Sequence, residues 1–362
     1  MSEVAVLGGG HGAYAAAADL AEQGHDVRLW RRDTAAFAPV RDSQQITLTD
    51  AAGSRTIGLS LASDDIGAVV AGADLIVVPG PAFAQTDIAQ AVAPYLRAGQ
   101  VFFLPPGSFG SFTMAQDIRA IAQIDDLAFS ETGTLPYLAR KHSAAEIAIS
   151  VRATRLPTGV FPADLTDRAL PIIASAYPSV ERIDDALSGA LMNAGPIIHT
   201  PLILMNAGPL EHFDRWDIHN EGTQPSIRRV TTALDGERIA LREALGYRLP
   251  HFPLADHYAE DGDEWMYGRR AHAKLTDSGD WRENIDLQAH RYMTEDVFFG
   301  LAFLVSVADW AGVKCPIASG LLAMASAIVG GDLRQQGRTL ENLGLAEMTP
   351  ENLTRLLNEG LS

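Results

Sequence analysis

The chain has 362 residues, 47 % of them hydrophobic, which is enough to build the cores of two domains. Its formal net charge of −17, without any block of basic residues, argues against binding to nucleic acid or to an anionic membrane. The one cysteine, Cys315, excludes an internal disulfide, and the scattered histidines predict no metal site. The N-terminus carries no basic leader, and the most apolar stretch, 297–313, is interrupted by Asp309, so a cytoplasmic protein is expected.

The first 30 residues predict a strand, a glycine turn, a helix and a second strand. Glu3–Leu7 is a short apolar run rich in β-branched residues, and the alanine-rich segment Tyr14–Gln23 has a helical composition. Gly24 ends that helix, and His25–Trp30 supplies the second strand. A β-α-β unit of this length whose turn has the form G-x-G-x-x-A is typical of dinucleotide-binding domains.

The glycine turn supplies the residues that would hold the dinucleotide. Gly8 permits a sharp turn, Gly10 has no Cβ to keep a pyrophosphate away from the main chain, and small Ala13 lets the helix pack close to the strand. The N–H groups at the start of the helix, with its partial positive charge, would face the phosphates. The cofactor-binding residues predicted from the turn are Gly8, Gly10, His11, Gly12 and Ala13.

Two arginines follow the second strand, at the place where the ribose of the adenosine is recognised. An acidic residue here usually binds the 2′-hydroxyl of NAD, whereas an arginine can bind the 2′-phosphate of NADP. Arg31 occupies this place with Arg32 beside it, so both are predicted to bind cofactor and NADP is favoured. Asp33 keeps NAD possible, and a solvated arginine pair is the alternative explanation.

Strands and helices alternate up to about residue 180. A hairpin is predicted at 46–61, and the buried strand Asp74–Val78 leads into Pro79, which should lie beside the nucleotide. Further strands are predicted at 100–104, 127–131 and 146–151, with a glycine-rich loop at 105–112. This alternation predicts a doubly wound parallel sheet of the Rossmann type.

From residue 184 onward the sequence has helical spacing and almost no strand character. Helices are predicted at 184–206, 225–245, 295–311, 316–329 and 350–359. We therefore expect an α/β dinucleotide-binding domain at 1–183 and an all-α catalytic and substrate domain at 184–362. The apolar helices within 297–329 indicate a homodimer surface, although packing in the core explains them equally well.

Several segments resemble the octopine/nopaline (opine) dehydrogenase family. They are the N-terminal β-α-β unit, ETGTLPYLAR at 131–140, MNAGPIIHTP at 192–201, NEGTQPSIRRVTTALDGERIALREALG at 220–246 and YMTEDVFFGL at 292–301. The resemblance covers nearly the whole chain in the expected order. It implies an NAD(P)-dependent oxidoreductase acting on CH–NH bonds, which condenses an α-keto acid with an amino acid or another amine, or runs the reverse reaction.

The resemblance also implies a catalytic His–Asp pair. The histidine of MNAGPIIHTP is His199 and the aspartate of the TED motif is Asp296, with Glu295 as the competing partner. A carboxylate on one ring nitrogen fixes the tautomer and is expected to raise the pKa of the imidazole toward the operating pH, where it can take up and return protons. By residue type alone, however, a histidine in an apolar helix is more often a core residue.

Two more residues are predicted to bind substrate. Arg291, five residues before Asp296, can hold a keto-acid carboxylate with its planar fork, unless it is simply solvated. Asn193, six residues before His199, can hydrogen-bond the cofactor or the substrate. Two other functions stay open: a hydroxy-acid or sugar-acid dehydrogenase on the same two-domain plan, and a nucleotide-binding sensor without turnover.

Overall fold

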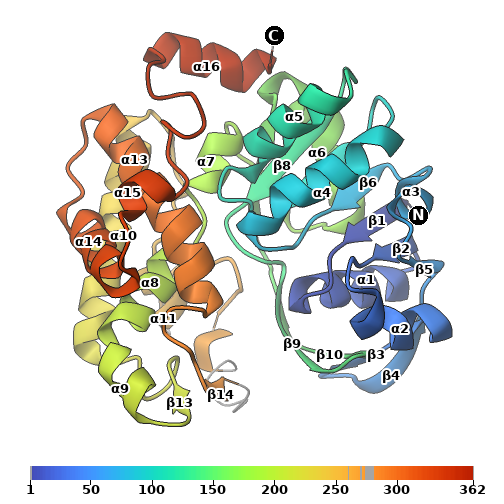
Figure 1. The fold of residues 1–362 in the computed structure, drawn as a ribbon, viewed down its shortest axis with the longest axis horizontal. Coiled ribbons are helices and arrows are strands. Elements are labelled where there is room, and N and C mark those ends of the chain that lie inside the picture. Colours follow the sequence, from blue (N-terminus) through green and yellow to red (C-terminus); the bar gives the residue numbers. More distant parts are fainter. Residues whose placement is uncertain (1, 260, 270, 274–280, 362) are drawn as a thin grey trace. The chain divides into compact units, whose positions relative to one another are not determined.

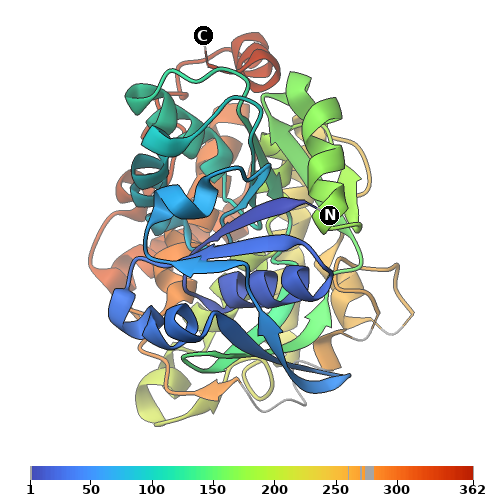
Figure 2. The same ribbon diagram turned by 90° about the vertical axis from the view of Figure 1, so that its right-hand side faces the viewer.

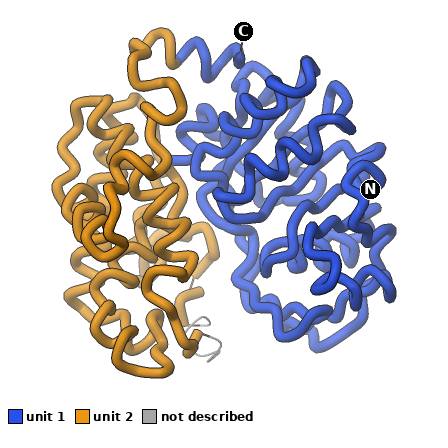
Figure 3. Tube along the Cα trace, in the orientation of Figure 1, with its two compact units in different colours: residues 1–190, 354–362 blue, residues 191–353 orange. Residues whose placement is uncertain are grey.

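The computed structural model describes residues 2–259, 261–269, 271–273 and 281–361 (Figure 1). The chain forms two compact units, residues 1–190 with 354–362 and residues 191–353 (Figure 3). The division falls after Ala190, later than the expected residue 183, because α7 (Ala186–Ala190) packs on two strands of the first unit, β8 and β11. The end of the last helix, α16 (Pro350–Glu359), also belongs to the first unit.

The first unit is built on an eight-stranded sheet of order β12-β11-β8-β7-β6-β1-β2-β5. These strands are β1 (Glu3–Leu7), β2 (Asp26–Trp30), β5 (Leu61–Ser63), β6 (Leu75–Val77), β7 (Val101–Leu104), β8 (Ala128–Thr132), β11 (Leu156–Phe161) and β12 (Val180–Arg182). All pairings are parallel except that of β11 with β8, so the predicted doubly wound sheet is confirmed with one antiparallel junction. The strand order reverses at β1, and dinucleotides bind at such a switch point.

A second sheet of four strands has the order β4-β3-β10-β9. The predicted hairpin at 46–61 is confirmed as β3 (Gln45–Asp50) and β4 (Gly53–Gly58), which pair antiparallel. The strand predicted at 146–151 belongs to this sheet, as β10 (Glu146–Arg152) beside β9 (Tyr137–Ser143), rather than to the large sheet. Residues of β10 alternate between buried and more exposed, which suits a sheet covered on one face only.

Helix α1 (His11–Glu22) lies between the two sheets (Figure 2). It contacts β2 on one side and β3, β9 and β10 on the other. The four alanines 15–18 are all buried, and only such small side chains allow both sheets to approach one helix. The alanine-rich composition of α1 therefore reflects a helix buried on two sides.

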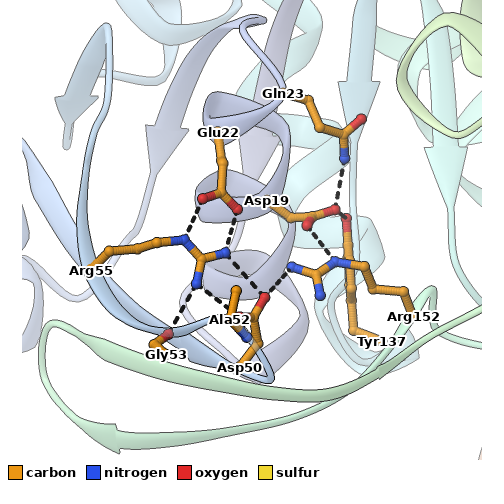
Figure 4. Close-up of polar contacts among 9 residues, drawn as sticks. All are labelled: Asp19, Glu22, Gln23, Asp50, Ala52, Gly53, Arg55, Tyr137 and Arg152. Carbon is orange, nitrogen blue, oxygen red and sulfur yellow. Dashed lines mark hydrogen bonds and ion pairs between the residues drawn. The ribbon is translucent and has the colours of Figure 1, made fainter.

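An ion-pair network joins the end of α1 to the second sheet (Figure 4). Asp19 accepts hydrogen bonds from Tyr137 Oη at 3.0 Å and from Arg152 Nε at 2.6 Å. Arg152 also reaches Asp50 at 2.8 Å, and Arg55 bridges Asp50 at 2.8 Å and Glu22. These bonds fix the β9–β10 hairpin against the helix.

The remaining helices of the first unit surround the large sheet. They are α2 (Thr34–Ser43), α3 (Ile66–Val70), α4 (Gln85–Val92), α5 (Gly110–Ile121) and α6 (Thr166–Ala176), with short 3-10 turns at Ala82–Ala84, Ala93–Tyr95 and Ala163–Leu165. Asp33 caps α2 by accepting from the Ala36 N–H at 3.1 Å.

The second unit is mainly helical, as predicted. It contains α8 (Gly195–Met205), α9 (Ala207–His212), α10 (Pro225–Ala244), α11 (Leu254–Tyr258), the π-helix η4 (Tyr292–Leu301), α13 (Ala302–Ala311), α14 (Pro316–Val329) and α15 (Leu333–Gln336), with the paired strands β13 (Trp216–Asp217) and β14 (Arg282–Glu283). The helix predicted at 184–206 is split into α7 and α8, because Pro196 starts a new helix. The helix predicted at 295–311 begins earlier and opens as a π-helix.

Candidate active site

His199 and Asp296 form a hydrogen-bonded pair in the second unit. The distance from His199 Nδ1 to Asp296 Oδ2 is 2.8 Å, and the two side chains are only 15 % and 7 % exposed. His199 comes from α8 and Asp296 from η4, so the pair joins two helices that are 97 residues apart in sequence. Asp296, rather than its neighbour Glu295, is the partner of the ring.

Two glycines let α8 and η4 approach closely enough for this pair. A Cβ on Gly195 would overlap Asp296 Oδ1, and a Cβ on Gly300 would lie within 2.9 Å of Pro196 Cβ and closer still to its Cγ. Either substitution would push the helices apart. The close approach of the two helices, and with it the His199–Asp296 pair, therefore depends on the glycines at positions 195 and 300.

The ring of Tyr292 stacks against one face of the His199 ring. The two rings are stacked, with centroids 3.8 Å apart and planes 12° from parallel. The Tyr292 hydroxyl is 2.7 Å from Nε2 of buried His219. Sequence reasoning did not single out Tyr292, although it begins the YMTED segment, and nothing local in the sequence connects it with His219.

Burial opposes charge on both members of the pair. It lowers the pKa of His199 well below its ordinary value, helped by the positive charge of Arg291, and it raises the pKa of Asp296 to about 7 although Arg291 acts against that. The expectation that the carboxylate raises the pKa of the ring is therefore wrong here, because loss of solvation dominates. At 2.8 Å the two groups titrate as a unit, and the hydrogen bond lets them share one proton near neutral pH.

The two predicted substrate residues lie in the same unit as the pair. Arg291 is exposed, with its guanidinium carbon 5.0 Å from the centre of the Tyr292 ring. Asn193 is buried, and its Oδ1 accepts a hydrogen bond from the Gly195 N–H at 2.9 Å, which fixes the start of α8. Arg291 is thus placed beside the pair, while Asn193 shapes the backbone that carries it.

The glycine turn of the first unit fits a dinucleotide. Gly8 has a φ of +148°, which favours glycine, and a Cβ on it would lie 3.4 Å from the Ala13 Cβ, so helix and strand are in close contact. A Cβ on Gly10 would meet no atom within 4 Å, which leaves room for a phosphate. Among the described residues no side chain caps the N-terminus of α1, which starts at His11, so its N–H groups face this space.

Close packing also fixes the other side of this turn. A Cβ on Gly12 would lie 3.1 Å from the Pro79 carbonyl oxygen and 2.7 Å from Leu135, so only glycine fits where α1 begins. His11 Nδ1 accepts a hydrogen bond from the main-chain N–H of Lys141 at 2.8 Å. Pro79 therefore contacts the start of α1, and the His11 ring is tied to the second sheet.

The two arginines after β2 point to different places. Arg31 folds back over the turn, since a Cβ on Gly9 would lie 2.5 Å from its Cδ, and its guanidinium is 3.4 Å from both the Tyr14 hydroxyl and Asp33 Oδ2. Arg32 instead pairs at 2.6 Å with Asp87, and both of those side chains are exposed. Arg31 is thus the arginine at the glycine turn.

Comparisons with known proteins match both parts of the chain. Residues 182–329 match the model of the NAD/NADP octopine/nopaline dehydrogenase α-helical domain, and residues 3–104 match the NAD-dependent glycerol-3-phosphate dehydrogenase N-terminus. An opine dehydrogenase of Arthrobacter sp. (strain 1C) is 28 % identical over 95 % of this chain and 96 % of its own. A vitopine synthase of Allorhizobium ampelinum is 27 % identical over 99 % of each chain. These similarities, which extend over nearly the whole chain, support its place in the opine dehydrogenase family.

Solved structures of the family share its fold. Octopine dehydrogenase in complex with NADH and agmatine covers 100 % of this chain and 99 % of its own, with a TM-score of 0.72 at 19 % identity. Yersinopine dehydrogenase with NADP+ bound covers 99 % and 98 %, with a TM-score of 0.68 at 14 % identity. As an opine dehydrogenase-type enzyme, the protein is an NAD(P)-dependent oxidoreductase acting on CH–NH bonds, which condenses a keto acid with an amino acid reductively.

Proposed function

We propose that His199 and Asp296 are the acid–base pair of this reductive condensation, that Arg291 binds the keto-acid carboxylate, and that NADP is the preferred cofactor. The observation that carries the proposal is the 2.8 Å bond between His199 Nδ1 and Asp296 Oδ2. With Nδ1–H donated to the carboxylate, Nε2 of a neutral ring is left as the proton acceptor.

The pair would serve each proton transfer of the reaction. His199 takes a proton from the ammonium group of the amine, so that the free amine attacks the keto carbon. It returns a proton when water leaves the carbinolamine, and then polarises the C=N bond of the imine. Asp296 holds the ring in one orientation and stabilises its charge during these transfers. The nicotinamide, when bound, supplies the hydride.

Arg291 supplies the cation that the substrate needs. The protein carries a net charge of −17, so an α-keto acid gains no general attraction and depends on a local arginine. Arg291 is an exposed residue, and its charge acts on both His199 and Asp296. A carboxylate bound there would also neutralise that charge, which makes protonation of the pair easier.

The preference for NADP rests on Arg31 and Asp33. The Asp33 carboxylate caps α2 by accepting from the Ala36 N–H. The Arg31 side chain lies over Gly9, so its guanidinium is the charged group at the turn. Arg31→Ala should weaken NADPH binding about tenfold and leave NADH binding nearly unchanged. Arg32→Ala should have the smaller effect, since Arg32 pairs with Asp87. Equal loss for both cofactors in Arg31→Ala would contradict the assignment.

The catalytic proposal is tested by His199→Gln and Asp296→Asn. Each should lower kcat for NADPH oxidation with keto acid plus amine by about 10²–10⁴-fold, with NADPH binding retained. His212→Gln, at an exposed histidine of α9, is the matched control. Unchanged turnover in His199→Gln would refute the acid–base role. NADPH oxidation with keto acid alone, without any dependence on added amine, would instead indicate a hydroxy-acid dehydrogenase.

We also propose that the enzyme is a cytoplasmic homodimer. One stretch, 186–205, is long and apolar enough to cross a membrane, but 83 % of it is buried inside the protein, as in the core helix of a soluble protein. The dimer is inferred from the apolar helices within 297–329, where Met324 on α14 is 50 % exposed. Light scattering coupled to size-exclusion chromatography measures the mass directly, and a monomer at micromolar concentration would overturn the dimer.

A further inference from the structure

Lys141 lies on strand β9, and its side chain reaches the glycine turn. Its Nζ is 3.3 Å from the Gly9 carbonyl oxygen and 3.4 Å from the centre of the Tyr14 ring. The hydroxyl of the same tyrosine lies 3.4 Å from Arg31 Nη1. Lys141 and Arg31 thus converge on the turn from two different sheets.

Lys141 and Arg31 place two positive charges at the glycine turn of a chain that is otherwise strongly acidic. Lysine occurs only three times in the sequence, whose net charge is −17, and among the described residues no carboxylate pairs with the Lys141 ammonium. Arg31 repels it, while Tyr14 offers only its ring face. A half-buried cation that faces another cation gains stability when an anion binds to both.

We propose that Lys141 and Arg31 together hold a phosphate group of the bound dinucleotide at the Gly8–Ala13 turn. The inference rests on the proposed cofactor role of this turn. The phosphate is the 2′-phosphate of NADP, the group that Arg31 is proposed to bind. Lys141 is then a binding residue that no glycine fingerprint would reveal, because it comes from a hairpin of the second sheet.

The hairpin is held in the position that this role requires. Lys141 donates its main-chain N–H to His11 at the start of α1, and further along the helix Asp19 bonds Tyr137 and Arg152 of the same hairpin (Figure 4). The side chain of residue 141 is therefore delivered to the turn by bonds that do not involve its ammonium group. Substitution of that side chain leaves the support intact.

The role has a pH signature. Burial, together with the charge of Arg31, lowers the pKa of Lys141 to about 8. The groups that face its side chain are Arg31 after β2 and Tyr14 on α1, and His11 faces its main chain; of these, Arg31 is the charged group that acts on Lys141. Lys141 is charged below about pH 8 and neutral above it, so dinucleotide affinity should fall as the pH rises through this value.

The experiment measures the Kd of NADPH and NADH by calorimetry between pH 7.0 and 9.5, where the 2′-phosphate keeps its full charge. In the unmodified protein the Kd for NADPH should rise about fivefold over this range. Lys141→Met should raise the Kd at pH 7.0 about tenfold and remove the pH dependence. Lys141→Arg should retain the affinity at pH 7.0 and also lose the pH dependence, because arginine does not titrate here. Lys314→Met, at an exposed lysine of the second unit, is the control.

The outcomes separate the possible failures. Loss confined to NADPH supports a 2′-phosphate shared by Lys141 and Arg31, whereas equal loss for both cofactors would place Lys141 on the pyrophosphate and overturn the shared site. An unchanged Kd in Lys141→Met, or an equal loss in Lys141→Arg, overturns it. Gly10→Ala tests the site itself, because its new Cβ enters the space left for the phosphate. If Gly10→Ala blocks binding while Lys141→Met does not, the dinucleotide site stands and only the role of Lys141 is lost.

Discussion

The carboxylate of Asp296 occupies the space that the missing side chain of Gly195 leaves at the start of α8. Asp296 is held there by its bond to His199, so it cannot swing away without breaking the pair. The identity of residue 195 thus decides whether the two helices can bring the proposed acid–base pair together.

Gly195→Ala should reduce kcat by about 10²-fold or more while the protein stays folded, because the new methyl group displaces Asp296 from the ring. Steady-state kinetics and circular dichroism check the two parts. Gly208→Ala is the matched control, since a Cβ on this helical glycine would meet no atom within 4 Å. Full activity in Gly195→Ala would mean that Asp296 does not need its present position.

The pH profile should follow the titration of the coupled pair. In reductive condensation the proton that His199 takes from the ammonium group must stay on the pair until water leaves, so turnover should slow as the pH rises through about 7, where Asp296 titrates. Oxidation of the secondary amine needs the unprotonated pair and should slow as the pH falls through the same value. Measurements of kcat against pH in both directions test this. A kcat that changes with pH in the same sense for condensation and for oxidation would contradict it.

Tyr292 should affect the pair through its ring more than through its hydroxyl. Tyr292→Phe keeps the stack on His199 but loses the bond to His219, so kcat should fall only a few-fold. Tyr292→Leu removes the ring face that favours a protonated imidazole, so kcat should fall about tenfold and the pKa of the pair should drop by about half a unit. Tyr95→Leu, at an exposed tyrosine of the first unit, controls for general effects. Equal pH profiles for both variants would rule out the stacking role.

Asp50 should stabilise the first unit down to acidic pH. Its carboxylate is 6 % exposed and bound by Arg55 and Arg152, and the bond to Arg55 most of all holds its pKa well below the ordinary value. Because the folded-state pKa is the lower one, this stability is present above the unfolded pKa of about 4 and disappears as the pH falls through the folded value. Asp50→Asn should cost about 1–3 kcal/mol at pH 7 in urea unfolding. Asp42→Asn, in an exposed pair with Arg41, should cost far less.

Much of the nucleotide half follows from local sequence. β1 and α1 appear where the apolar run and the alanines predict them, because strand, glycine turn and helix are decided within a few residues. The chain gives no comparable local signal for Lys141. Its place depends on β10 pairing with β9 through two register shifts and on β3 joining from far upstream. Such long-range pairing cannot be read from a single sequence.

The candidate active site divides in the same way. The family resemblance predicts His199 and Asp296 as site residues, whereas the hydrogen bond between them depends on how α8 packs against η4. The predicted direction of the His199 pKa shift is wrong, because the sequence does not show how far the ring is buried away from solvent. The π-helix was also not predicted, since its residues have the same apolar spacing as an α-helix.

The contacts that the π-helix η4 makes with α8 are regularly spaced along its sequence. Tyr292, Asp296 and Gly300 recur at every fourth position, and each meets α8 in a different way: a stack on His199, a bond to the same ring, and a close approach to Pro196. One residue added or removed within the helix would rotate everything beyond it onto another face of the helix. Substitutions can therefore tune the three contacts one at a time, but a single insertion or deletion would lose the register among them at once.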